Sequence, residues 1–204
     1  MNLEITDQEK FWMSKFGDDY IQRNLNHKEH IKRNFAKILI KNNIEIHSCV
    51  EFGSNVGINL DALKELYPEL NSFGIEINKK AFEIMNKKHD GFQGSVYEFS
   101  SNKKYDLTLS AGVLIHQNPN KLKSFYKNLY NFSKKYILLI EYFSPEPVGV
   151  NYRGSDDKLF KRDFAGEFID MYPKSKVIDY GFIWSRDKFA WGDDTNWFLI
   201  EKSL

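Results

Sequence analysis

Residues 51–57 read EFGSNVG and stand between a short β-rich run, SCV (48–50), and a segment with helical apolar spacing that Pro68 ends. They therefore form a strand-to-helix turn. In open α/β sheets a ligand binds outside the carboxyl ends of the strands, where such a turn lies. Gly53 allows a tight turn, and Gly57 lets the helix start close to the strand with backbone N–H groups directed at the ligand. The stretch predicts an α/β fold with a cofactor at this turn.

Strand and helix patterns alternate along the rest of the chain, which indicates a mostly parallel sheet with helices on both faces. The apolar run KYILLIEYF is typical of a central strand buried on both faces. Two final strands without a helix between them predict an antiparallel addition at the sheet edge. Expected strands are 48–53, 71–76, 91–95, 105–113, 135–143, 176–184 and 196–202; expected helices are 56–67, 81–89, 120–133 and 157–172, with a loop over 144–157.

The first 45 residues have helical patterns of their own. Thr6 followed by Glu9 fits a capping box. The apolar stripe after it consists of Phe11, Trp12 and Phe16. Residues 27–42 have the pattern of an amphipathic helix. We expect one domain, with a helical lid over 1–45 and an α/β core over 46–204.

Composition excludes several classes of protein. With 29 Lys+Arg against 28 Asp+Glu, the net charge of +1 provides no field that would attract nucleic acid or an anionic membrane. No apolar run approaches the ~20 residues of a membrane helix, and the polar start MNLEITDQEK does not fit a secretory signal. The single Cys49 and the scattered histidines do not have metal-ligand spacing. We expect a cytoplasmic protein without a metal or an obligate protein partner.

The spacing of the glycines distinguishes between cofactors. A dinucleotide loop, GxGxxG, needs glycines two and five positions after Gly53, where this chain has Asn55 and Ile58. The pattern ExGxxxG instead resembles the glycine loop of class I methyltransferases, usually ExGxGxG. S-adenosylmethionine carries no pyrophosphate, and asparagine tolerates a left-handed backbone, so the change at the middle position costs little. Glu51 is then expected to help hold the amino-acid end of the cofactor.

A second acid lies at the sequence separation from the glycine loop that a class I methyltransferase site requires. Glu76 ends the strand 71–76, 23 residues after Gly53. A carboxylate at about that separation can accept hydrogen bonds from both ribose hydroxyls. Ile77, the next residue, is expected at the same site.

The ends of the third and fourth strands complete the expected cofactor site. Ser95 and Val96 fall where methyltransferases contact adenine, although an acid is more usual there. Ala111 and Gly112, at the end of the fourth strand, are expected to pass beneath the methionine portion.

Longer blocks resemble one family, the pseudaminic acid biosynthesis-associated methylases, whose genes accompany nonulosonic-acid sugar synthesis in bacteria. These blocks are FWMSKFGDDYIQRN (11–24), EFGSNVGINLDALKELYPEL (51–70), AGVLIHQNP (111–119), KRDFAGEFIDMYP (161–173), DYGFIWSRD (179–187) and TNWFLIEK (195–202). The resemblance implies a Rossmann-like class I methyltransferase with a seven-stranded, mostly parallel sheet and an antiparallel edge strand. It implies methyl transfer from S-adenosylmethionine to a sugar or sugar nucleotide, at nitrogen or oxygen. Methylation of a protein side chain and a catalytically silent cofactor-binding protein remain the alternatives.

Methyl transfer is an in-line displacement, so positioning and removal of a proton are what the protein supplies. His116 lies just beyond the fourth strand and is predicted to be a general base or a substrate contact. The structural alternative is a histidine bonded to the local turn before Pro119. In the lid, Arg23 is expected to pair with the methionine carboxylate while Tyr20 covers the sulfonium side; the alternative is plain helix packing with a surface arginine.

Basic and aromatic residues after the fifth strand predict the acceptor pocket. An acidic sugar or a phosphate would suit Tyr152, Arg153 and Arg162, because a guanidinium is a two-pronged donor. Lys161 has the same chemistry, although a solvated helix face explains it as well. The loop before the last strand could close the pocket with Trp191, Asp193 and Asp194.

Overall fold

The computed structural model describes residues 4–24 and 27–203, and its main feature is a seven-stranded sheet. The strand order is β3-β2-β1-β4-β5-β9-β8. Strands β1 to β5 pair in parallel, and β9 runs antiparallel to both β5 and the edge strand β8. This confirms the mostly parallel sheet with an antiparallel edge. The bounds are β1 (Ser48–Phe52), β2 (Asn71–Glu76), β3 (Asp90–Gln93), β4 (Tyr105–Ala111), β5 (Ser133–Glu141), β8 (Lys176–Ile183) and β9 (Thr195–Glu201).

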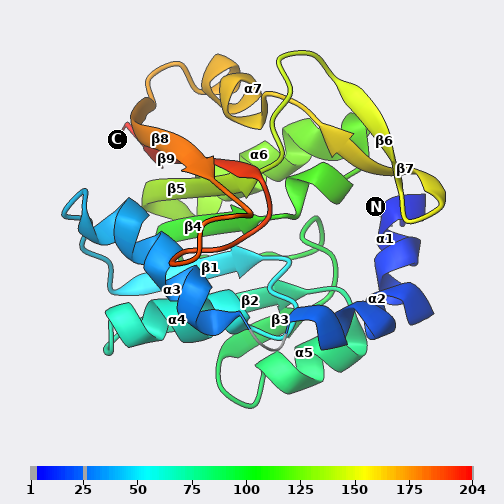
Figure 1. Ribbon diagram of the computed structural model, residues 1–204, viewed down its shortest axis with the longest axis horizontal. Coiled ribbons are helices and arrows are strands. Elements are labelled where there is room, and N and C mark those ends of the chain that lie inside the picture. The colour runs from blue at the N-terminus through cyan, green and yellow to red at the C-terminus, as the bar shows by residue number, and fades with distance from the viewer. Residues whose placement is uncertain (1–3, 25–26, 204) are drawn as a thin grey trace.

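Helices cover both faces of this sheet (Figure 1). On one face lie α3 (Lys28–Phe35) with its π-helical extension η2 (Ala36–Ile40), α4 (Ile58–Leu66) and α5 (Lys79–Met85). The other face carries α6 (Leu122–Phe132) and α7 (Phe164–Met171). Two short 3₁₀ turns, η3 (Leu114–His116) and η4 (Pro119–Lys121), connect β4 to α6. Among the described residues, no helix has both the length and the apolar character to cross a membrane.

Alternation along the strands divides the apolar side chains between two core clusters. In β5, Ile137 and Leu139 pack under α6 and α7, whereas Tyr136 and Leu138 pack under α3 and α4. Successive strand residues point to opposite faces, so a strand covered on both sides is apolar throughout. The expectation of a doubly buried β5 is confirmed.

The N-terminal helices lie at the carboxyl ends of the parallel strands, beside a separate hairpin (Figure 1). These helices are α1 (Asp7–Met13), α2 (Lys15–Tyr20) and η1 (Ile21–Asn24). The predicted capping box is present: Thr6 Oγ1 accepts from the Glu9 backbone N–H at 3.2 Å, and the Glu9 carboxylate accepts from the Thr6 N–H at 2.8 Å. It fixes where α1 begins.

The segment after β5 was predicted wrongly. Instead of a loop over 144–157 and a helix from 157, the chain forms a hairpin of β6 (Val148–Tyr152) and β7 (Ser155–Lys161), and α7 begins only at Phe164. Arg153 and Gly154, with φ of 53° and 83°, form the tight turn that brings the two strands together. Pairing between the strands thus overrides the helical spacing of the sequence. The Asp163 side chain caps the start of α7 by accepting a hydrogen bond from the Gly166 N–H at 2.8 Å.

Candidate active site

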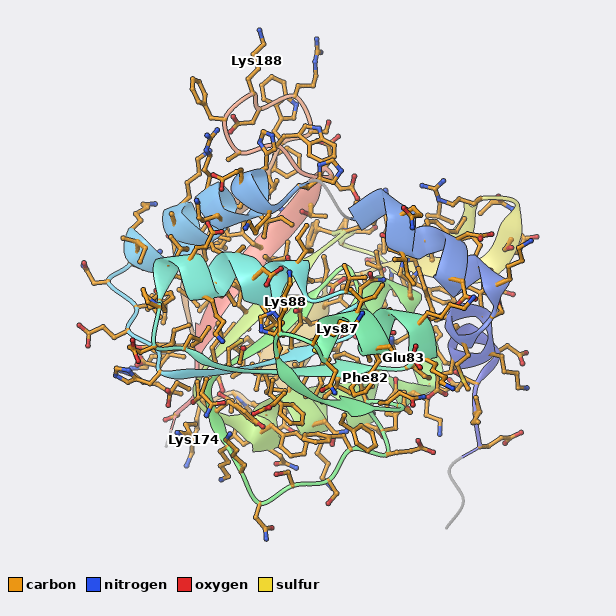
Figure 2. All side chains as sticks on the ribbon, turned by 90° about the horizontal axis from the view of Figure 1, so that it is seen from below. Phe82, Glu83, Lys87, Lys88, Lys174 and Lys188 are labelled. Atoms are coloured by element: carbon orange, nitrogen blue, oxygen red, sulfur yellow. The ribbon has the colours of Figure 1, made fainter. Side chains whose placement is uncertain are left out.

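A cavity of about 470 Å³ opens at the carboxyl ends of the parallel strands. Its volume falls within the roughly 300–1,000 Å³ of small-molecule sites. Loops after β1, β2, β3 and β4 line it, together with α1, α2, α3 and the loop between β8 and β9. Lys188 marks the projecting outer part of that last loop in Figure 2. The sequence-predicted residues on the cavity wall are Tyr20, Gly53, Asn55, Glu76, Ile77, Ser95, Val96, Ala111, Gly112, His116, Arg153, Trp191 and Asp193.

The glycine loop has the backbone conformation that its residues favour. Gly53 has φ of +71°, and a Cβ there would come within 2.6 Å of a Val113 methyl. Asn55 is left-handed, with φ of 47°. Gly57 precedes α4 with φ of +81°, and a Cβ there would lie 2.9 Å from Met85. Glycine is therefore required both by conformation and by close approach at positions 53 and 57.

The N–H groups of this loop are not directed at a ligand, contrary to the expectation from sequence. Every backbone N–H from residue 53 to 57 donates to an acceptor of the protein. The acceptors are Ile75 O for Gly53 and Ser54 (2.8 and 3.0 Å), the Glu76 carboxylate for Asn55 (2.7 Å), the Asn55 side chain for Val56 (2.8 Å) and Ser54 O for Gly57 (2.8 Å). A phosphate cradle needs such groups free. The backbone of residues 53–57 therefore has no free N–H group to offer a phosphate.

Glu51, the penultimate residue of β1, is a buried acid with one unsatisfied oxygen. Its Oε1 accepts from the Asn59 amide at 2.5 Å, and Oε2 has no hydrogen-bond partner among the residues that the structure describes. Burial raises the pKa of the Glu51 carboxyl to about 8. Asn59 and Ser54 line the cavity and Glu51 does not, but the Ser54 hydroxyl is a second buried polar atom without a described partner. A positively charged ligand group would satisfy this region.

Glu76 lies between the glycine loop and the start of α5. Its carboxylate accepts from the Asn55 and Asn78 backbone N–H groups, each at 2.7 Å. Burial raises the pKa of Glu76, and these N–H groups oppose the rise. Because a carboxylate has about four acceptor sites, Glu76 can hold the loop and still accept from ligand hydroxyls on the cavity wall.

His116 is held in one tautomer. Its Nδ1 lies 2.6 Å from Lys158 O, and since a carbonyl can only accept, Nδ1 carries the hydrogen and Nε2 is an acceptor. Burial lowers the pKa of His116 to about 4, so the ring is neutral at pH 7. The rings of Trp12 and Tyr152 each pack 4.8 Å from it. The side chain is thus bonded to β7 through Nδ1, rather than to the local turn before Pro119.

Glu141, at the end of β5, has a positioning role that the sequence interpretation missed. It is buried, and its carboxylate accepts from the Ser110 hydroxyl at 2.7 Å and from the Val113 and Leu114 N–H groups at 3.1 Å. Burial raises its pKa to about 7. These bonds hold the turn that carries His116. The sequence offered one clue to this role: Glu141 is a lone acid at the end of an apolar strand. A buried acid needs hydrogen-bond partners, so such a residue is expected to bond to its surroundings.

The N-terminal helices α1 and α2, which the sequence predicts to be a lid, are tied to the core beside the cavity. Trp12 O accepts from the Asn78 amide at 3.1 Å, and Asp18 pairs with Lys80 of α5 at 2.6 Å. The Tyr20 ring packs 5.1 Å from Trp12. Arg23 belongs to η1, but its side chain lies outside what the structure describes, so its pairing stays a prediction.

The hairpin and the last loop bring together part of the predicted acceptor pocket. Arg153 lines the cavity from the hairpin turn, and Tyr152 packs on His116. Arg162 does not line this cavity; it pairs with Glu167 of α7 at 2.7 Å. Trp191 reaches the cavity from the loop before β9 and packs 4.6 Å from the His27 ring. Within the described part of the chain, no group of three His, Cys, Asp or Glu residues could hold a metal.

Comparison with known proteins finds similarity in structure and not in sequence. No family profile and no curated protein matches the chain. Magnesium protoporphyrin IX methyltransferase from Synechocystis PCC 6803, with bound S-adenosylhomocysteine, is similar with a TM-score of 0.70 at 15% identity, over 97% of this chain and 100% of that one. The 1,6-didemethyltoxoflavin-N1-methyltransferase of Burkholderia thailandensis, with bound substrate and S-adenosylhomocysteine, has a TM-score of 0.69 at 13% identity, over 100% and 94%.

A third similar structure is an S-adenosylmethionine-dependent methyltransferase from Clostridium acetobutylicum, with a TM-score of 0.65 at 10% identity, over 93% of this chain and 98% of that one. At such identities the likeness concerns the fold. This chain has the Rossmann-like fold of class I methyltransferases, as its sequence predicted.

Proposed function

We propose that this protein is an S-adenosylmethionine-dependent methyltransferase acting on a small molecule. One observation carries the proposal: the glycine loop uses all its N–H groups from 53 to 57 internally and stands beside the Glu76 carboxylate on the cavity wall. That site favours a ligand with ribose hydroxyls and no phosphate at the turn. Structural neighbours crystallised with S-adenosylmethionine or S-adenosylhomocysteine support it.

The cofactor is placed by the chain's own residues. Glu76 would accept hydrogen bonds from the ribose hydroxyls, and Ile77 would lie beside it. The Glu51 and Ser54 oxygens that lack a described partner would hold the amino-acid end, and Ala111 would contact the methionine portion. Residues 1–45 act as the lid on a single-domain core of 46–204, with Tyr20 over the sulfonium side and Arg23 on the carboxylate.

We further propose a sugar or sugar nucleotide of nonulosonic, pseudaminic-type acid metabolism as the acceptor. The blocks that resemble the pseudaminic acid-associated family support this class. So does the wall beyond His116, where Arg153 offers a cation for an acidic group and Trp191 a flat apolar face. The lid and the β8–β9 loop around the cavity favour a small acceptor over a protein side chain.

When bound, the sulfonium supplies the methyl group. The protein orients the acceptor: unprotonated His116 Nε2 accepts a hydrogen bond from the attacking O–H or N–H and receives its proton. Trp12 and Tyr152 hold the imidazole in place, and Glu141 holds its turn. The surrounding aromatic rings keep water away from the reacting atoms.

Calorimetric titration with S-adenosylhomocysteine and S-adenosylmethionine tests the cofactor, and we expect one site per chain. Absence of binding would overturn the proposed function. Transfer of a labelled methyl group to acidic sugars and sugar nucleotides, with peptides as a parallel panel, tests the acceptor. Labelling of peptides alone would favour the protein-methylating alternative, and tight binding without transfer to any acceptor would favour a silent cofactor-binding protein.

His116→Ala should lower kcat by about tenfold to a hundredfold while leaving the affinity for S-adenosylhomocysteine within about twofold, because the ring acts on the acceptor. Since its pKa is about 4, Nε2 is already free at pH 6, and the wild-type rate should show no histidine titration between pH 6 and 8. Steady-state kinetics across that range measure both effects. The exposed His47→Ala is the control, and a wild-type rate in His116→Ala would leave the residue with a structural role.

A further inference from the structure

The carboxylate of Glu9, in the lid helix α1, is buried against the loop that follows β3. Glu9 is 9% exposed and lines the cavity. Its Oε1 accepts a short hydrogen bond from the Ser95 hydroxyl, although the two residues are 86 positions apart. The capping box thus accounts for the hydrogen bonds of Glu9 Oε2, whereas Oε1 bonds to a residue on the far side of the cavity edge.

Glu9 has acceptor capacity left over. Its Oε2 accepts from the Thr6 N–H at 2.8 Å and the Thr6 hydroxyl at 2.9 Å, and Oε1 accepts from Ser95 alone among the hydrogen bonds of the described residues. An ionised carboxylate offers about four acceptor sites. No cation pairs with Glu9 within the described part of the chain. A buried acid in this state favours a donor from a ligand.

The other polar groups at this end of the cavity are occupied. The single hydrogen of the Ser95 hydroxyl goes to Glu9, and its oxygen accepts from the Tyr97 N–H at 3.2 Å. The Gln117 amide donates to Val113 O at 3.1 Å, and its oxygen accepts from the Tyr97 hydroxyl at 2.9 Å. Glu9 is therefore the strongest acceptor left for a donor at this place.

This end adjoins the proposed ribose site. The Gly94 N–H donates to Glu76 O at 2.9 Å, so the loop after β3 is bonded directly to the end of β2. A nucleoside whose ribose lies on the Glu76 carboxylate would carry its base past Gly94 toward Ser95 and Glu9, all of which line the cavity. Adenine presents an exocyclic amino group, which is a donor, on its edge.

We propose that Glu9 accepts a hydrogen bond from the adenine amino group, so that the lid helix, and not the strand end, reads the base. The assignment rests on the proposed function. It accounts for the serine at position 95, where an acid is more usual in methyltransferases: in this chain the acid comes from α1. Because α1 also carries Trp12 onto His116, binding of an adenine base holds in place the helix that completes the acceptor site.

Binding of S-adenosylhomocysteine and of S-inosylhomocysteine, measured by calorimetry, tests this inference. The inosine analogue replaces the amino group with a carbonyl, which cannot donate to a carboxylate; its one new donor, the ring N1–H, lies at a different position on the base edge. The wild type should bind the adenosine compound at least about tenfold more tightly, as sites built around a buried polar contact do. In Glu9→Gln the preference should fall by about tenfold or more, since an amide can turn its NH₂ toward the carbonyl.

Two further variants separate base reading from helix capping. Thr6→Ala removes the capping hydroxyl but leaves the Glu9 carboxylate, so it should melt at a lower temperature and keep the wild-type preference. Glu9→Asp keeps the charge and withdraws it by one methylene, so it should lose preference even if Glu9→Gln folds poorly. Equal preference in the wild type and the Glu9 variants would overturn the assignment alone. Failure of the wild type to bind either compound would overturn the proposed function and this inference with it.

Discussion

Glu76→Ala should weaken binding of S-adenosylhomocysteine by about 1–3 kcal/mol, a factor of roughly five to more than a hundred in Kd. The variant loses the proposed acceptor of the ribose hydroxyls. It also leaves the Asn55 and Asn78 N–H groups without the carboxylate that each now contacts at 2.7 Å. Both losses weaken binding, because the first removes a ligand contact and the second releases the glycine loop.

Calorimetry at pH 7.5 measures the change, and a urea unfolding curve records how much stability is lost with it. The matched control is Glu83→Ala, because Glu83 is an exposed acid on α5 that Figure 2 labels at the surface. The control should bind as the wild type does. Unchanged affinity in Glu76→Ala would remove the ribose assignment, and with it the principal support for the cofactor.

Glu51→Gln should have opposite effects on stability and on cofactor binding. Burial raises the pKa of Glu51 from 4.5 to about 8, so between these values the folded state holds a proton that the unfolded state releases. Stability from this group is therefore present below the unfolded pKa and is lost as the pH rises toward 8. A pKa that differs by one between the folded and unfolded states corresponds to about 1.4 kcal/mol, so the loss is on the order of a few kcal/mol by pH 8. The amide of Gln does not titrate. The variant should therefore become more stable relative to the wild type as the pH rises from 4.5 to 8.

The same variant should bind S-adenosylhomocysteine more weakly by about 1–3 kcal/mol, because Glu51 can release its proton and pair with the ammonium group, whereas an amide stays neutral. Urea unfolding at pH 5.5, 7 and 8, with calorimetry at pH 7.5, tests both effects. Glu141, whose pKa is also raised, is common to both proteins and cancels in the comparison. Glu45→Gln, at an exposed position before β1, is the control. Parallel stability curves for the wild type and Glu51→Gln would contradict the burial argument.

The prediction from sequence was most accurate where one local rule decides the structure. Residues 71–76 form β2 as predicted, and Thr6 with Glu9 forms the capping box. Both follow from spacing and side-chain chemistry within a few residues. Helix ends were less accurate: α5 was expected over 81–89 and spans Lys79–Met85, because the Asn78 side chain caps it by accepting from the Ala81 N–H at 3.0 Å.

Prediction failed where strand pairing or a tertiary contact overrides the local spacing. Residues 157–161 have helical spacing but belong to β7, which pairs with β6, and Arg162, just after β7, meets Glu167 rather than the cavity. Glu9 has the sequence of a capping residue, and nothing near it in the chain reveals its contact with Ser95. Long-range pairing is decided by the whole fold and leaves little local signal.

The amino-acid sequence by itself determined the sheet, the strand-to-helix turn and the positions of Glu51 and Glu76 on it, because hydrophobic period and glycine conformation are local properties. Tertiary structure alone decided which hydrogen-bonding groups of that turn remain available to a ligand. The N–H groups of residues 53–57 bond to Ile75, Glu76 and neighbouring loop atoms, so side chains and not the backbone are left to recognise a ligand. It also decided the Nδ1–H tautomer of His116, through a carbonyl 42 residues away. A hydrogen bond depends on distance in space, and the packed sheet alone sets that distance.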